Sequence, residues 1–164
     1  MIRLIIDKLG GGHDDLFLKI DPMPSYSKIA DSYYLLDFLE ISDTDLQELN
    51  LTENETLKYK AAELLRYWIN RIKQIGNGQK TFIPFDLSDE YVSGLMFEKT
   101  KLGFKTKIVY TDKIHGYAVG KSNLDNQIEN NKIEFIEEEH AEWLVEEDEL
   151  FGGLDWSIRE LTSE

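Results

Sequence analysis

Cysteine is absent from this sequence of 164 residues. The absence excludes disulfide bonds, thiolate metal sites and cysteine nucleophiles, and it suits a reducing compartment. Long hydrophobic runs are missing as well, since no stretch approaches the roughly 20 apolar residues that a membrane-spanning helix needs. The apolar run at Ile2–Ile6 is closed by Asp7 and is too short for a signal peptide. We therefore expect a cytoplasmic protein that has no membrane partner.

Internal repeats, low-complexity tracts and linkers are absent too, and the three prolines fit strand ends or loops. Hydrophobic residues make up 41% of the chain and charged residues 30%, which is typical of a globular protein and not of a disordered one. A chain of this length buries roughly 70% of its unfolded surface on folding. We therefore predict a single domain over residues 1–164, with a hydrophobic core that is stable without disulfide bonds or a structural metal.

Positively charged residues are also scarce, since the chain has 18 Lys and Arg against 32 Asp and Glu and a net charge of −14. The charge is unevenly distributed along the chain. Residues 134–164 hold twelve acids and a single base, Arg159, which gives that segment a charge of −11. Residues 58–133, in contrast, hold thirteen bases and eight acids. Such a chain repels nucleic acids and anionic membranes overall and attracts basic proteins at a distance. We expect no nucleic-acid partner and no membrane partner.

Alternating apolar and polar residues predict two antiparallel groups of strands. The first group is a meander around a turn at residues 10–15, with strands at Ile2–Ile6, Leu16–Ile20 and residues 33–41. The second group follows later, with strands at residues 81–85, 91–99, 104–111 and 116–119. Residues 133–136 form either a last strand or the lead into a helix.

A long amphipathic helix is predicted between the two groups, over residues 57–75, because its apolar residues form one stripe about 100° wide. Capping boxes are predicted at Thr44 with Gln47 and at Thr52 with Glu55. The turn at residues 76–78 ends this helix. The stripe consists of Leu57, Ala61, Leu64, Leu65, Trp68, Ile72 and Ile75.

The acidic end of the chain follows a helical period from His140 onward. One face carries His140, Trp143, Leu144, Leu150, Phe151, Leu154, Ile158 and Leu161. The opposite face carries Glu138, Glu142, Glu146 and Glu149. We expect Gly152 and Gly153 to divide this segment into two helices, with a further capping box at Ser157 and Glu160. The predicted fold class is α+β: antiparallel sheets packed against one long amphipathic helix, with an acidic C-terminal helical segment.

Motifs that carry chemistry are lacking. Gly116 to Ser122 ends like a phosphate-binding loop, but only three residues separate its glycines where that loop needs four. Glu137 and His140 have the spacing of a di-iron ligand pair, yet no second pair exists, so we interpret His140 as a core-edge histidine. His13 and His115 lie in turn-like contexts, and no nucleophile motif is present. We predict no catalytic residue, no metal and no cofactor.

Two groups of side chains suggest binding sites at first and have simpler interpretations. The lysines at and beside the hairpin of residues 91–111, including Lys101, Lys105 and Lys107, fit the solvated face of a half-buried hairpin. Large aromatic residues could line a ligand pocket, but core packing is the ordinary interpretation of their spacing. These residues are Tyr33, Tyr34, Trp68, Trp143 and Trp156.

Residues 82–91 have the sequence FIPFDLSDEY and are followed by Gly94 and a strand. This segment resembles segments of small immunity proteins of bacterial polymorphic toxin systems. The chain is similar to these proteins in its acidity, its modest length, its lack of cysteine and its Glu-rich segment with tryptophan. The resemblance implies a protein that blocks a cognate toxin, often a basic nuclease, by occluding its active site.

The sequence thus predicts a non-enzymatic immunity protein whose partner is a basic toxin domain. The expected partner-binding residues are Asp86, Asp89, Glu90, Glu138, Glu142, Glu146 and Glu149. Two alternatives stay open: an acidic interaction or adaptor protein, and an enzyme whose site is assembled from scattered residues.

Overall fold

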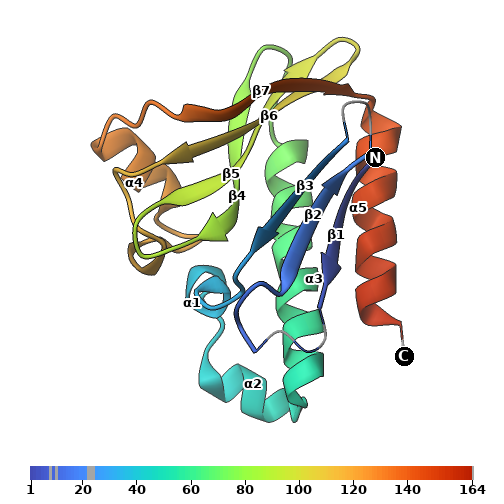
Figure 1. The fold of residues 1–164 in the computed structure, drawn as a ribbon, viewed down its shortest axis with the longest axis vertical. Helices are drawn as coiled ribbons and strands as arrows, with labels where there is room; N and C mark the ends of the chain where they lie inside the picture. The colour runs from blue at the N-terminus through green and yellow to red at the C-terminus, as the bar shows by residue number, and fades with distance from the viewer. Residues whose placement is uncertain (8, 10, 22–24, 164) are drawn as a thin grey trace.

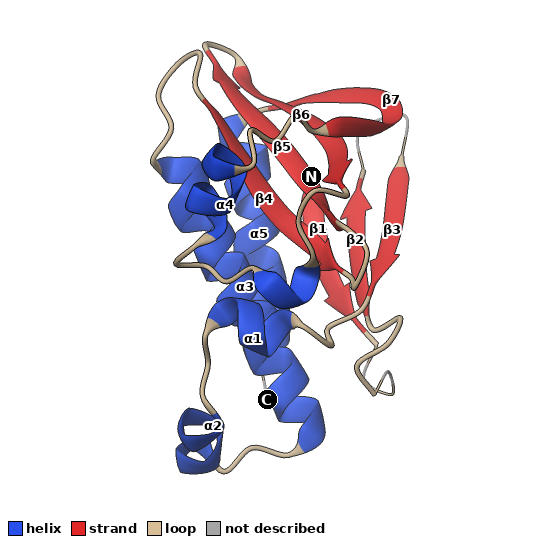
Figure 2. Ribbon diagram, turned by 90° about the vertical axis from the view of Figure 1, so that its left-hand side faces the viewer, coloured by secondary structure: helices blue, strands red, loops and turns tan. Residues whose placement is uncertain are grey.

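The computed structural model describes residues 1–7, 9, 11–21 and 25–163, and it does not describe the side chains of residues 139–141. Two antiparallel sheets and a long helix form an α+β fold, which confirms the predicted class. Figure 2 shows most of the helices gathered on one side of the strands. Gly10, Pro22 and Pro24, predicted to lie in turns, at strand ends or in loops, are outside the described residues. No helix in the described ranges is long and apolar enough to cross a membrane.

Sheet A contains β1 (Ile2–Ile6), β2 (Leu16–Ile20) and β3 (Tyr26–Ala30) in that order. The meander is as predicted, but its third strand is β3, and the strand predicted at residues 33–41 is wrong. That segment contains the short helix α1 (Leu35–Leu39). The cause is the spacing of Leu35, Phe38 and Leu39, which a helix places on one buried face and a strand would divide between two faces.

Helix α3 (Glu53–Lys73) is the central element and confirms the predicted long helix. Thr52 caps its first turn, and Glu55 completes the predicted capping box. Trp68 is fully buried on its inner face, where its Nε1 donates a hydrogen bond of 2.9 Å to the carbonyl of Pro84. The box predicted at Thr44 is wrong, because α2 (Asp43–Leu49) begins after Ser42, whose side chain pairs with the amide of Asp45 instead.

Sheet B contains β4 (Lys80–Leu87), β5 (Val92–Thr100), β6 (Gly103–Thr111) and β7 (Ile136–Val145) in that order. Its first three strands confirm the predicted second group. The strand predicted at residues 116–119 is wrong, because Gly116–Ala118 forms the 3-10 turn η1. The helix α4 (Leu124–Asn130) follows where no element was predicted.

Strand β7 overturns the predicted helical start at His140. Trp143 and Val145 are buried while Glu142 and Leu144 are exposed, so the burial alternates with the period of a strand. The free edge of β6 supplies the hydrogen-bonding partners, for example Thr106 opposite Trp143, and this pairing overrides the helical pattern. The predicted core-edge position of the His140 side chain lies outside the described residues.

The helix α5 (Glu147–Thr162) is continuous, so the predicted break at Gly152 and Gly153 is wrong. Gly153 is buried against β1, and Ser157 lies inside the helix instead of capping a new one. Figure 1 shows α5 beside β1, so that the last helix of the chain covers the outer edge of the first strand. Sheets A and B meet at the edge of sheet A that is opposite β1, where β3 lies next to β4.

Candidate protein-binding surface

Two of the predicted partner-binding carboxylates lie where the sheets meet. Asp86, on β4, is 6% exposed, and its Oδ2 accepts a hydrogen bond of 2.9 Å from the hydroxyl of Tyr91. Burial raises the pKa of Asp86 above its ordinary value, although Lys28 lies 3.7 Å away. Glu138, on β7, accepts hydrogen bonds of 2.6 and 2.8 Å from Lys28. Both carboxylates therefore make contacts within the fold that stabilise the junction of the two sheets.

Lys28, Asp86, Tyr91, Ser93 and Glu138 form an inter-sheet cluster that contains one pair with the spacing of a catalytic dyad. Nζ of Lys28 lies 2.8 Å from Oγ of Ser93, the distance of a serine–lysine pair. Such a pair needs an uncharged lysine and an accessible serine. Two carboxylates face the Lys28 ammonium, and Ser93 is 1% exposed. The cluster is therefore an ion-paired joint between the sheets.

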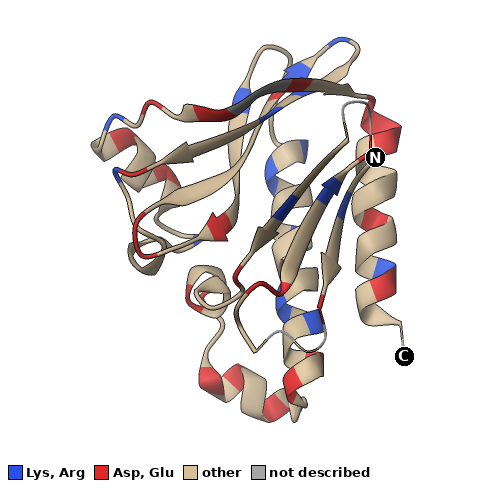
Figure 3. Ribbon diagram, in the orientation of Figure 1, with Lys and Arg blue, Asp and Glu red and all other residues tan. Residues whose placement is uncertain are grey.

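The remaining glutamates of the predicted helical face do not form one surface. Glu142 lies on β7, opposite Lys107, and pairs with Lys105 and Lys107 at 3.6 and 3.5 Å. Glu146 is the residue before α5, and Glu149 binds the N-terminal ammonium at 2.6 Å. Figure 3 shows acidic residues spread over α2, α4, β7 and α5. The ion pairs of Glu142 partly neutralise Lys105 and Lys107, which agrees with the predicted solvated face of the β5–β6 hairpin.

Asp89 and Glu90 are both exposed, in the turn between β4 and β5. The hydroxyl of Tyr34 donates a hydrogen bond to Oδ1 of Asp89, and this bond raises the pKa of Tyr34 to about 12. The carboxylate thereby marks the middle of a row of aromatic rings at the surface. Among the seven predicted residues, Asp89 contacts a feature that is suited to binding, and Glu90 follows it in the same turn.

The aromatic row consists of His13, Tyr33, Tyr34, Tyr117 and His115, in that spatial order. At its ends the rings stack, with centroids 5.6 Å apart for His13 and Tyr33 and 5.4 Å apart for Tyr117 and His115. Tyr34 joins the two halves by an edge contact to Tyr33 at 4.9 Å and a tilted contact to Tyr117 at 6.5 Å. Three segments that are distant in sequence, at residue 13, residues 33–34 and residues 115–117, thus combine into one surface.

Much of this row faces solvent. Tyr33 is 60% exposed and Tyr117 is 59% exposed, although each has an aromatic neighbour that could have covered it. Aromatic rings that touch one another at the surface form an exposed patch, and such patches commonly mark interaction sites. A partner that covers the rings gains the free energy of burying their apolar surface. Tyrosine is also among the residue types that concentrate binding energy at protein interfaces.

Carboxylates adjoin the row at its middle and at one end. Oδ2 of Asp31 lies 3.1 Å from Nδ1 of His13, and its Oδ1 accepts a bond of 2.6 Å from the amide of Asp14. Partial burial acts to raise the pKa of Asp31, but these two bonds outweigh it and hold the pKa below its ordinary value. The same Asp31 contact raises the pKa of His13. The row is therefore an aromatic surface with an acidic rim.

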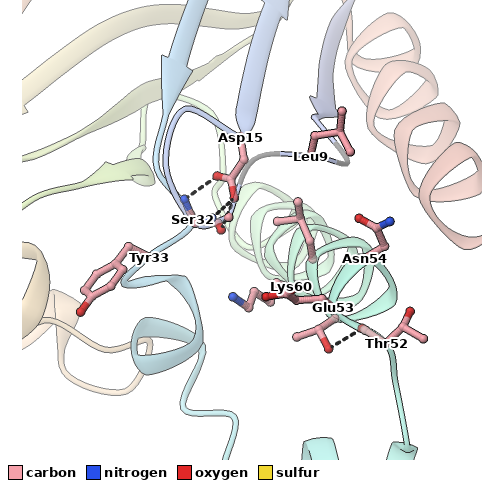
Figure 4. A pocket seen from close by; sticks show the side chains of 12 residues that line it. Leu9, Asp15, Ser32, Tyr33, Thr52, Glu53, Asn54 and Lys60 are labelled. Carbon is pink, nitrogen blue, oxygen red and sulfur yellow. Dashed lines mark hydrogen bonds between the residues drawn. The ribbon is translucent and has the colours of Figure 1, made fainter.

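A cavity of about 550 Å³ opens beside Tyr33, between the β1–β2 turn and the first turns of α3 (Figure 4). Asp15 lies in its wall and accepts bonds of 2.8 and 2.7 Å from the amide and hydroxyl of Ser32. Lys60 extends from α3 into the lining, and burial lowers its pKa. Tyr33 belongs both to the cavity lining and to the aromatic row.

Sequence reasoning missed this surface for a definable reason. Trp68 and Trp143 are core residues, as expected, but Tyr33 and Tyr34 were assigned to the same interpretation. The histidines were recognised only as residues in turns. The available signal was that Tyr33, Tyr117 and both histidines fall in or beside turns, where aromatic side chains have no core to enter.

No group of three or more His, Asp or Glu side chains arranged for a metal ion occurs in the ranges that the structure describes. Comparison of the chain with protein-family models, with curated proteins and with solved structures gives no match.

Proposed function

We propose that this chain is an immunity-type protein of the cytoplasm, which binds a basic toxin domain and occludes its active site. The aromatic row with its acidic rim is the observation that carries this proposal. The rings supply contact area, and the carboxylates occupy the place that phosphates take on a basic nuclease. The fold leaves Tyr33 and Tyr117 of this surface largely exposed.

The charge of the whole molecule supports the same function. A net charge of −14 raises the rate at which a basic partner is captured, up to ~10⁸–10⁹ M⁻¹s⁻¹ at low salt. Rapid capture is what protection against a toxin requires, because free toxin damages the cell that makes it. A rim charge acts mainly on this association rate, whereas buried contacts act on dissociation.

Co-expression tests the proposal. The chain is produced together with the protein encoded beside it, and growth and a complex on a sizing column are scored. Rescue of growth and co-elution are expected for the native chain. The double variant Tyr33→Ala/Tyr117→Ala should lose both, while Leu102→Ala, which alters a 73% exposed residue in the β5–β6 turn, should retain both.

One result would contradict the proposed function and a second would contradict only its interface. Absence of both rescue and complex for the native chain would contradict the immunity role and favour an adaptor or an enzyme with a scattered site. Rescue that persists in the double tyrosine variant would leave the immunity role intact and remove the aromatic row as its interface.

A further inference from the structure

We infer that the aromatic row receives arginine side chains of the partner, in preference to lysine. This inference rests on the proposed function and specifies the chemistry of the partner at the contact. It follows from the combination of exposed ring faces and unshared carboxylate oxygens on one surface. Each part alone fits many ligands, whereas the two together fit a planar cation.

The ring faces are the first part. A guanidinium is planar and weakly hydrated, so it stacks on an aromatic face while its N–H groups remain free to bind elsewhere. Both kinds of cation already lie over rings in this chain, with the guanidinium of Arg3 5.4 Å from the ring centre of Trp156 and Nζ of Lys99 4.3 Å from that of Phe104. The preference for arginine therefore rests on the planar shape of the guanidinium and not on these contacts. One face of Tyr33 stacks on His13 and one face of Tyr117 stacks on His115, and no Lys or Arg of the described ranges lies over either tyrosine.

The carboxylates are the second part. Asp89 uses Oδ1 for the hydroxyl of Tyr34, and among the described residues no hydrogen bond is made to its Oδ2. The side chain of Glu90 likewise has no ion pair within the described part of the chain. A guanidinium on the row could donate an N–H to Oδ2 of Asp89 while its plane stacks on a ring. A lysine ammonium is a point charge that retains its water more strongly.

Other occupants fit less well. A second copy of the chain would bring another charge of −14, and the acidic rims would repel each other. A nucleic acid would be repelled in the same way. An uncharged peptide would cover the rings but leave the carboxylates of the rim without partners.

Matched peptides test the inference directly. Tetra-arginine and tetra-lysine, both with blocked ends, carry the same charge and are titrated into the full chain while backbone amide shifts are followed by NMR. The arginine peptide should bind at least about threefold more tightly, corresponding to ~0.6 kcal/mol, with the largest shifts at Tyr33, Tyr34 and Tyr117. Tyr33→Ala/Tyr117→Ala should abolish this preference, and Leu102→Ala should preserve it.

Equal affinities for the two peptides, or a preference that survives the double tyrosine variant, would overturn the inference. The variants are checked by circular dichroism, and because both tyrosines are largely exposed, the fold should be retained. The two proposals fail in distinguishable ways. Tyrosine-dependent rescue of growth without an arginine preference removes only the inference, and an arginine preference without rescue removes only the immunity role.

Discussion

The backbone N–H of Leu4 donates a hydrogen bond of 3.1 Å to the hydroxyl of Ser157, across 153 positions of the sequence. That hydroxyl in turn donates to the carbonyl of Gly153 at 3.0 Å, within α5. Both Leu4 and Ser157 are buried. A single side chain therefore satisfies a backbone group on the outer edge of β1, where no neighbouring strand is available.

Replacing Ser157 by alanine should lower the free energy of unfolding by about 1–3 kcal/mol, because the N–H of Leu4 would remain buried without an acceptor. Urea denaturation measures the change. Thr162→Ala is the control, since this exposed hydroxyl donates to a carbonyl of its own helix and its loss should matter little. Equal effects of the two substitutions would show that the contact with β1 is unimportant.

Neighbouring glycines in α5 should respond oppositely to alanine. A Cβ at Gly152 meets nothing within 4 Å, so Gly152→Ala should raise the free energy of unfolding by up to about 1 kcal/mol through helix propensity. A Cβ at Gly153 would lie 2.4 Å from the carbonyl oxygen of Ile2, so Gly153→Ala should lower it by about 1–3 kcal/mol. Thermal and urea unfolding decide the matter, and matching signs would refute this packing of α5 on β1.

Trp68 should be the costliest position in α3. Trp68→Ala should lower the free energy of unfolding by roughly 3–5 kcal/mol, because it removes a fully buried ring that packs against Phe85. Trp68→Phe keeps part of the packing but leaves the carbonyl of Pro84 without its indole donor, so an intermediate loss is expected. Chemical denaturation provides the measurement, and a loss below about 1 kcal/mol for alanine would contradict the assigned core.

Asp86 should make stability depend on pH in an unusual direction. Its raised folded pKa means that its contribution is fully present below the ordinary aspartate pKa of about 4 and is lost as the pH rises through the folded pKa. Compared with Asp86→Asn, the native chain should therefore become relatively less stable as the pH rises from about 4 to 7. Unfolding free energies of both proteins across this range test it.

Asp125 provides the opposite control. Its carboxylate receives two hydrogen bonds from Arg71, at 3.1 and 2.7 Å, and these hold the pKa of Asp125 below its ordinary value. The stability it contributes is present above the ordinary pKa and is lost as the pH falls through the folded one. Below about pH 4, the Asp125→Asn comparison should thus slope the other way, and a slope of the same sign as at Asp86 would contradict the opposite pKa shifts of the two groups.

Reversing charge at the aromatic row should weaken binding of a cationic peptide more than the same reversal elsewhere. Asp89→Lys/Glu90→Lys should reduce the affinity for tetra-arginine at least about fivefold at low salt. Asp155→Lys/Glu160→Lys changes the net charge equally on exposed positions of α5 and should reduce it less than about twofold. Similar losses for both variants would mean that the peptide responds only to total charge.

The sequence was sufficient for the elements whose pattern is local. The stripe from Leu57 to Ile72 and the capping box at Thr52 define α3 within one stretch of chain, and the strands of sheet B alternate clearly. Strand β7 was not predictable in this way, because Trp143 and Leu144 suit a helix until β6 offers an edge. The prediction of a strand at residues 33–41 was wrong because a short apolar run is compatible with either a helix or a strand.

The candidate surface was predictable only at Asp89 and Glu90, through the segment that resembles immunity proteins. The rings of His13, Tyr33 and Tyr117 come together through the tertiary fold, and no spacing in the sequence expresses their contact. The net charge of a segment does not show which carboxylates form ion pairs. It could not show that Glu138 is committed to Lys28 while Glu90 is not paired within the described residues.

The position of α5 along β1 also has a consequence for synthesis. A ribosome makes residues 2–6 long before residues 147–162, so the nascent chain carries β1 with an uncovered outer edge until α5 has been made. A bare strand edge is a template for pairing with other chains. Products released early, before α5 is made, should therefore aggregate or be degraded.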